Sequence, residues 1–216
     1  MSFILEKIIN IPIVLISLMV HELAHGWVSV KQGDPTPKLA GRMTFNPLDH
    51  LDPIGTLLMI FTGFGWAKPV PINPRYYKDS KKGMALVAFA GPLSNLLLAF
   101  AALIIYAVIF ILYVKFGIFA RSLDSIGFIT NRFITMNLCF AVFNMIPIPP
   151  LDGSRILGLF LSTRAYFKFQ EYERYSFMLI ILLSAMGVFS RIIGTGVAFL
   201  YSNMFGLIEK IVTLVV

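Results

Sequence analysis

Residues 83–114 read GMALVAFAGPLSNLLLAFAALIIYAVIFILYV and contain no charged side chain. A helix needs about 20 apolar residues to cross the hydrocarbon core of a bilayer, so this run is long enough to do so. Gly91-Pro92 and Asn95 interrupt the run near its start, and we interpret them as permitting close helix packing and a kink. The run predicts a membrane-spanning helix and therefore an integral membrane protein.

The composition of the whole chain agrees with this interpretation. Hydrophobic residues make up 57% and charged residues 13% of the 216 residues, and the mean hydropathy is +0.81. A typical soluble domain is roughly 45–50% apolar and about 25% charged, so this chain lacks the charge to cover a water-exposed surface. A soluble enzyme and a disordered chain are excluded, and the single cysteine, Cys139, excludes a disulfide-stabilised scaffold.

Other apolar stretches cover residues 3–30, 133–143 and 175–216. Arg191, Gly194 and Gly196 divide the last stretch, which forms either one long helix or two shorter ones. At about 20 residues for each span, the length holds five or six spanning or half-spanning helices. We therefore predict an all-α polytopic membrane protein in which residues 1–216 form a single domain, with the lipid bilayer as its surroundings.

Residues 31–82 have a different character, because seven prolines break any long helix there. Residues 39–45 alternate between apolar and polar side chains, and residues 66–72 are a second candidate strand. Together they predict a short, membrane-associated β-hairpin-like region. The apolar stretch between them, residues 54–64, is too short to span a bilayer, and we expect it to be re-entrant.

The distribution of lysine and arginine predicts an orientation. Residues 31–82 and 155–174 together hold twelve of them, whereas the N-terminus and the linker at residues 115–132 hold four. Because cytosolic loops carry the excess of positive charge, we expect the first two segments in the cytosol and the N-terminus outside. The net charge of +7 then reflects orientation in the membrane, and we expect no nucleic acid as a partner.

The sharpest chemical signal is His21-Glu-Leu-Ala-His25, within the first apolar stretch. On a helix, residues i and i+4 share a face, so both imidazoles can reach one ion, and zinc accepts such nitrogens at about 2.0–2.1 Å. Glu22 lies beside the first histidine, where it can take a proton from an attacking water. In a soluble helix these could be solvated surface residues, but burial in an apolar run is unfavourable without a function and favours a metal site.

A catalytic zinc normally has three protein ligands, so a third must come from elsewhere in the chain. Asp152 is the best candidate because it follows a proline-broken apolar stretch and Gly153 gives the backbone freedom beside it. A helix N-cap would account for Asp152 equally well. Asn144 could hydrogen-bond a scissile carbonyl or its oxyanion, or satisfy carbonyls freed by the proline kinks. His50 could take a metal role or lie in a polar turn. The other candidate ligands are Asp49, Asp52 and the acids near Glu171.

Together these motifs resemble the site-2 protease family of intramembrane zinc metalloproteases. The resemblance is carried by His21-Glu-Leu-Ala-His25 in the first span and by Asn144-x-x-Pro147-x-x-x-Leu151-Asp152-Gly153 in a later one. Residues 46–55 and 90–95 are also similar to bacterial members of that family. The matching motifs extend from residue 21 to residue 153.

The resemblance implies that His21, His25 and Asp152 bind one Zn²⁺, that Glu22 is the general base and that Asn144 lies near the substrate. It implies a minimal member without a PDZ or CBS domain. It further implies a transmembrane protein or peptide as substrate, and an active site that opens to the cytosol of a prokaryotic cell.

Two alternatives stay open. Membrane proteases that process prenylated proteins share the HExxH motif but use a downstream glutamate as third ligand, for which Glu171 and Glu173 are the candidates. A non-catalytic membrane binding protein or an ion transporter could use the same His/His/Asp cluster, but a binding site would not require Glu22.

Overall fold

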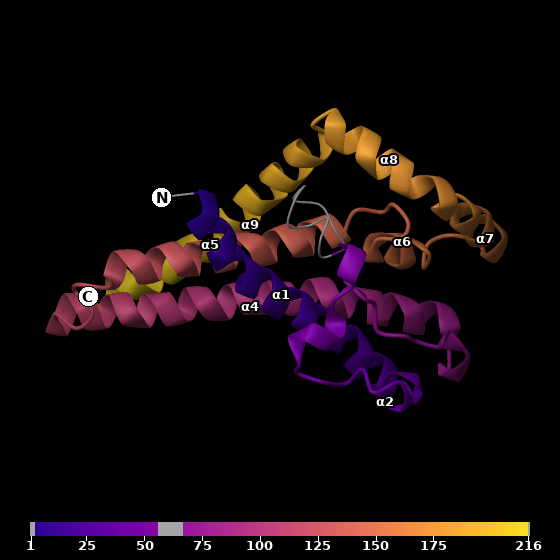
Figure 1. The fold of residues 1–216 in the computed structure, drawn as a ribbon, viewed down its shortest axis with the longest axis horizontal. Coiled ribbons are helices and arrows are strands. Elements are labelled where there is room, and N and C mark those ends of the chain that lie inside the picture. The colour runs from indigo at the N-terminus through magenta and orange to yellow at the C-terminus, as the bar shows by residue number, and fades with distance from the viewer. Residues whose placement is uncertain (1–2, 56–66, 216) are drawn as a thin grey trace.

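The computed structural model describes residues 3–55 and 67–215, and these are predominantly helical (Figure 1). The long helices are α1 (Phe3–Lys31), α4 (Ser80–Phe116), α5 (Leu123–Asn144) and α9 (Val188–Val215). The shorter helical segments are α2 (Thr36–Leu39), η1 (Pro47–His50), η2 (Pro74–Tyr76), α6 (Asp152–Leu157), α7 (Thr163–Glu171) and α8 (Glu173–Ala185). The predicted all-α class is therefore confirmed.

Within the described residues, four helices are long and apolar enough to cross a membrane. They are Ile8–Lys31, Ser80–Phe116, Leu123–Asn144 and Val188–Val215. Four of the expected five or six spanning or half-spanning helices are therefore full-length candidates, and α6, α7 and α8 are too short to cross the whole bilayer.

Helix α4 is the centre of the arrangement and contacts α1, α5, α6 and α9. It begins at Asp79, whose side chain accepts hydrogen bonds from the N–H groups of Lys81 and Lys82. It ends at Gly117, which adopts a left-handed conformation with φ 68°. In Figure 1, α4 and α5 lie side by side along the longest axis, with α1 crossing them.

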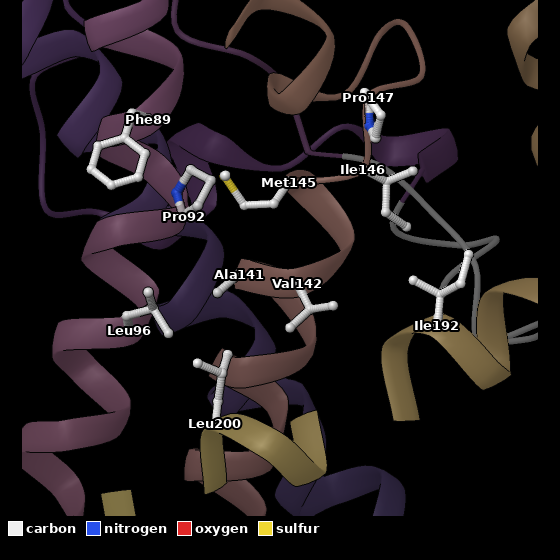
Figure 2. Close-up of a pocket in the computed structure, with 10 residues that line it drawn as sticks. All are labelled: Phe89, Pro92, Leu96, Ala141, Val142, Met145, Ile146, Pro147, Ile192 and Leu200. Atoms are coloured by element: carbon white, nitrogen blue, oxygen red, sulfur yellow. The ribbon is translucent and has the colours of Figure 1, made fainter. Parts of the chain in front are cut away.

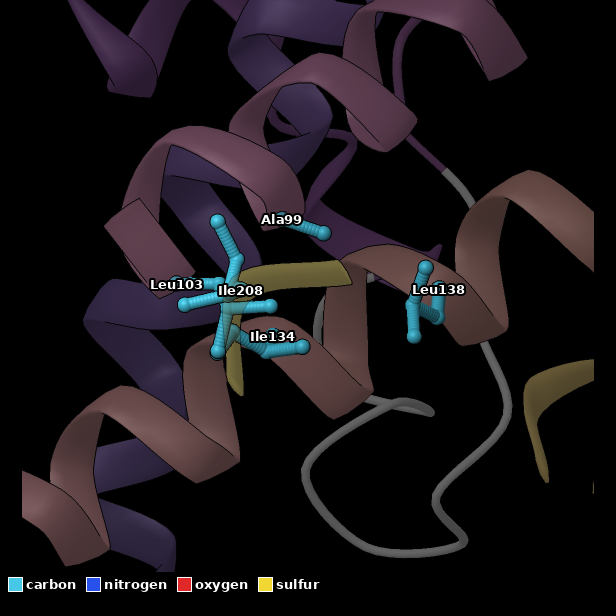
Figure 3. Close-up of a cluster of buried hydrophobic side chains, with 5 residues drawn as sticks. All are labelled: Ala99, Leu103, Ile134, Leu138 and Ile208. Atoms are coloured by element: carbon cyan, nitrogen blue, oxygen red, sulfur yellow. The ribbon is translucent and has the colours of Figure 1, made fainter. Parts of the chain in front are cut away.

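The main hydrophobic core joins α4, α5 and α9 (Figure 3). Its buried members are Ala99, Leu103, Ile134, Leu138 and Ile208. A smaller cluster packs the end of α5 and the following turn against α8 and α9, with Ile146, Leu151, Ile180 and Phe189 buried. The two clusters hold the C-terminal end of α5, where the chain turns towards α6.

The predicted β-hairpin-like region is not seen in the described part of the chain. Residues 39–45 leave α2 through a turn at Gly41 (φ 65°), so the alternating pattern is interrupted by a reversal of the backbone. In the described part of the second segment, Ala67 forms an isolated antiparallel bridge to Leu51, and no strand follows because Pro69 and Pro71 have no backbone N–H to donate. Most of the expected re-entrant stretch at residues 54–64, and residue 66, lie outside the described residues.

The last apolar stretch forms two helices, α8 and α9, but the break lies earlier than expected. The chain turns at Gly187, which has φ 72°. Arg191, Gly194 and Gly196 were predicted to divide the stretch and instead lie inside α9. Glycine in a helix lowers stability only modestly, so neighbouring apolar residues can carry the helix through these positions.

Candidate metal centre

Helix α1 and the first residue of α6 bring three potential metal ligands together. His21, His25 and Asp152 are 4%, 9% and 7% exposed. The Nε2 atoms of the two histidines lie 3.1 and 3.3 Å from Oδ2 of Asp152. Among the described residues, these three form the group of His, Cys, Asp or Glu side chains that could hold a metal ion.

The spacing of these atoms fits zinc. Ligand atoms at about 2.0–2.1 Å from a tetrahedral zinc are themselves roughly 3.3 Å apart, close to the two distances observed. Oδ2 of Asp152 is fully buried and accepts no hydrogen bond from the described residues, so the group has an unpaired acceptor aimed between two imidazoles. Burial by itself would raise the pKa of Asp152, but the positive charge of His25 and His21 in their protonated form lowers that pKa below its usual value, so the carboxylate stays ionised beside them.

Asp152 does not cap α6. The N-cap residue is Leu151, and Asp152 lies in the first turn of the helix without a side-chain cap hydrogen bond. The alternative reading of Asp152 as a helix cap is therefore not supported, and its carboxylate is instead directed at the two histidines.

The other nitrogen of each imidazole is held by a hydrogen-bond acceptor. Nδ1 of His21 lies 2.7 Å from Oδ1 of Asn95, and Nδ1 of His25 lies 2.7 Å from the carbonyl oxygen of Val87. Because both partners accept, each Nδ1 carries a hydrogen, and in the neutral imidazole each Nε2 then keeps its lone pair for a ligand bond. Such partners commonly fix the orientation of metal-binding histidines.

Asn95 is itself fixed by a buried network between three helices. Its Nδ2 donates to the carbonyl of Ser17 (3.2 Å) and to Oδ1 of Asn137 (2.9 Å), and Nδ2 of Asn137 donates to the carbonyl of Phe133 (2.9 Å). The Ser17 carbonyl and Oδ1 of Asn137 can only accept, so the NH₂ group of Asn95 must face them and Oδ1 of Asn95 must face His21. We interpreted Asn95 as a packing residue, but its burial in an apolar run was the signal of this further role.

Two glycines allow the helices to approach the site. A Cβ at Gly91 in α4 would lie 2.5 Å from atoms of both the His21 and the His25 rings. A Cβ at Gly153 would lie 2.3 Å from the carbonyl oxygen of Met145. Gly91 thus lets the backbone of α4 touch both imidazoles, and Gly153 lets α6 lie directly on the turn that follows α5.

Glu22 is half-buried next to the group, and its Oε2 accepts a hydrogen bond from the backbone N–H of Val70 at 2.9 Å. The other candidates are engaged elsewhere. Nδ2 of Asn144 donates to the carbonyl of Phe140 in its own helix (3.1 Å). Nε2 of His50 lies 2.9 Å from the carbonyl of Thr44, so this buried histidine stabilises a loop.

The remaining carboxylates are not part of the group that the described residues form. Oδ1 of Asp52 accepts from the N–H of Gly55 (2.8 Å), as a helix cap does. Glu171 and Glu173 lie on α7 and α8 with exposed side chains. The alternative with a downstream glutamate as third ligand therefore has no support in this structure.

An apolar cavity of about 450 Å³ lies beside the site, between α4, α5 and α9 (Figure 2). Its wall includes Pro92, which follows Gly91, and Met145, whose carbonyl contacts Gly153. The cavity thus lies against the residue that follows Gly91 and against the turn that precedes α6.

The sequence of the chain matches a known protein family. Residues 10–187 match the model described as "Peptidase family M50". The chain belongs to peptidase family M50. This family comprises the site-2 proteases, so the resemblance seen in the two sequence motifs is confirmed, and with it the expected enzyme class, a zinc metalloprotease. The four apolar helices agree with an integral membrane protein.

Three similar proteins bear the name "Putative zinc metalloprotease". YwhC of Bacillus subtilis is 39% identical over 170 residues, which cover 78% of this chain and 76% of that protein. Rip2 of Mycolicibacterium smegmatis is 24% identical over 174 residues, covering 78% and 63%. MJ0611 of Methanocaldococcus jannaschii is 34% identical over 106 residues, about half of each chain. No solved structure matches this M50 protein.

Proposed function

We propose that this M50 protein is an intramembrane zinc metalloprotease that hydrolyses peptide bonds in or near the transmembrane segments of membrane proteins. In this proposal His21, His25 and Asp152 bind one Zn²⁺ and Glu22 is the general base. The observation that carries the proposal is the convergence of the three potential ligand atoms. Two of them lie beside Glu22 on a helix long enough to cross a membrane, and the third comes from α6.

Zinc in such a site acts as a Lewis acid and lowers the pKa of a bound water to about 7. The residues of the chain do the rest. Glu22 takes a proton from the attacking water and returns it to the leaving amine. Asn95 and the Val87 carbonyl hold the two imidazoles so that their Nε2 atoms face Asp152. Asn144 contacts the substrate through its Nδ2, which has two hydrogens, one of them donated to Phe140.

The substrate is a membrane protein or peptide, and the active site opens to the cytosol. The orientation is supported by the excess of lysine and arginine in residues 31–82 and 155–174. The apolar cavity beside the site supports a substrate with apolar side chains near the scissile bond. The protein lies in the plasma membrane of a prokaryote, in line with its bacterial and archaeal relatives.

The test combines zinc content with cleavage of a transmembrane substrate in detergent or liposomes. Wild type should bind one zinc per chain and cleave. Asp152→Ala should lose both properties, whereas Glu22→Gln should keep zinc and lose cleavage. Full zinc in Asp152→Ala would refute the ligand assignment, and cleavage by Glu22→Gln would refute the general base.

A further inference from the structure

Residues 67–73 form an extended segment, here called the strap, that lies against α1 beside the metal centre. The strap contains Lys68-Pro69-Val70-Pro71. Proline has no backbone N–H, so Val70 supplies the one main-chain donor of the Pro-Val-Pro stretch. That donor is directed at Oε2 of Glu22, at 2.9 Å.

Both ends of the strap are fastened to neighbouring loops. The carbonyl of Lys68 accepts from Nη2 of Arg42 (2.6 Å), and the N–H of Lys68 donates to the carbonyl of His50 (2.9 Å). At the other end, the N–H of Asn73 donates to Oδ2 of Asp34 (2.7 Å). Arg42, His50 and Asp34 are all buried. The backbone of the strap is thus held on both sides of Val70.

The Val70 side chain is also held against α1. It is 6% exposed, and a Cβ on Gly26 would lie 3.1 Å from its Cγ1. Gly26 is four residues after Glu22, so the two positions share one face of the helix. Val70 therefore contacts α1 twice, through its side chain at Gly26 and through its N–H at Glu22.

We propose that Val70 is a positioning residue, whose backbone N–H holds the Glu22 carboxylate in the orientation in which it takes the proton from the attacking water. This inference rests on the proposed role of Glu22 as general base. A hydrogen bond to an ionised carboxylate is about twice as strong as a neutral one, and it removes rotamer freedom from a long side chain. With Oε2 engaged, Oε1 accepts the proton.

The two prolines serve this arrangement. They fix φ at both neighbours of Val70 and leave no competing donor next to it. They also prevent the strap from continuing a ladder of strand hydrogen bonds here, so the Val70 N–H is available to a side chain rather than to another strand.

The test compares two proline substitutions in the strap. Val70→Pro removes the N–H that reaches Glu22, whereas Ile72→Pro removes an N–H that has no acceptor among the described residues. Zinc content, kcat and KM for a transmembrane substrate are measured for both. We expect Val70→Pro to lower kcat by about 10- to 100-fold, the effect of one hydrogen bond to a charged group, with zinc content and KM close to wild type. Ile72→Pro should lose no more than a few-fold.

Three further variants make the result decisive. Val70→Ala retains the N–H and reports the loss of packing on Gly26 alone, so its kcat should fall much less than that of Val70→Pro. If Val70→Pro loses zinc through misfolding, replacing the Val70 amide by an ester removes only the N–H and should give the same kcat loss.

Glu22→Gln separates the positioning role of Val70 from the general-base role of Glu22. If it is inactive while Val70→Pro or the ester matches Ile72→Pro in kcat, the positioning role is refuted and the base stands. If Glu22→Gln is active, the base itself is refuted.

Discussion

Replacing Gly91 by alanine should damage the metal site although the change adds one methyl group. The new Cβ would lie 2.5 Å from His21 and His25, about 1 Å closer than ordinary van der Waals contact. The rings cannot simply retreat, because Asn95 and the Val87 carbonyl hold their Nδ1 atoms. Either α4 or both imidazoles must shift.

The size of the effect follows from that distance. Inserting a methyl group into a packed site costs about 1–3 kcal/mol, and misplacing a reacting group by about 1 Å can lower the rate roughly 100-fold. We therefore expect Gly91→Ala to bind zinc about 10- to 100-fold more weakly and to lower kcat/KM by roughly 100-fold. The helix itself should gain about 0.5–1 kcal/mol from alanine, so a loss cannot come from helix propensity.

The assay is a chelator competition for zinc affinity, with cleavage kinetics and thermal unfolding on the same detergent-purified samples. Gly194→Ala is the matched control, because a Cβ at that position in α9 meets nothing within 4 Å. It should retain zinc affinity and activity. If Gly91→Ala matched Gly194→Ala in all three measurements, α4 could not pack against the imidazoles as described, and the reasoning would be refuted.

Three other substitutions test the surroundings of the site. Asn95→Ala should weaken zinc binding by about 10- to 100-fold in the chelator competition, because Nδ1 of His21 loses its acceptor. Gly153→Ala should lower the thermal midpoint and the zinc content, since its Cβ would lie 2.3 Å from the Met145 carbonyl oxygen, part of the backbone. Asp34→Asn should lower the thermal midpoint at pH 7. Burial favours a raised Asp34 pKa, but hydrogen bonds from Thr36, Asn73 and Ser29 lower that pKa below its ordinary value of 3.8. The ionised Asp34 carboxylate therefore stabilises the folded state above pH 3.8, and this stabilisation is lost as the pH falls through the lowered pKa.

Each of these outcomes has a clear contrary result. Unchanged zinc affinity in Asn95→Ala would show that His21 is oriented without it. A Gly153→Ala protein with wild-type midpoint would mean that α6 can move away from the turn after α5. A midpoint difference between Asp34→Asn and wild type that stays constant from pH 7 to about pH 3 would show that the stabilisation does not depend on the ionised carboxylate.

The helical architecture could be predicted from sequence because it depends on local properties. The run of residues 83–114 is apolar throughout, and a helix is the way in which one segment satisfies its own backbone in a bilayer. The strand predicted for residues 39–45 rests on a short alternation, which the turn at Gly41 interrupts. The break between α8 and α9 depends on the left-handed Gly187, and glycine alone does not tell a break from a helical position.

The candidate site was predicted to the extent that it depends on spacing within one helix. His21, Glu22 and His25 are placed together by the helical period. Asp152 is the best of several candidate acids by sequence, and the structure brings it within 3.1 and 3.3 Å of the two imidazoles.

By itself, the sequence determined the membrane setting, the helical class and the pairing of two histidines with a glutamate, because composition and the i, i+4 period act within a single segment. Only the tertiary structure shows that Asp152 meets the histidines, why Gly91 and Asn95 matter and what Val70 contacts. Those relations depend on how closely separate helices and the strap approach one another, and that distance is set by the packing of side chains from several segments at once.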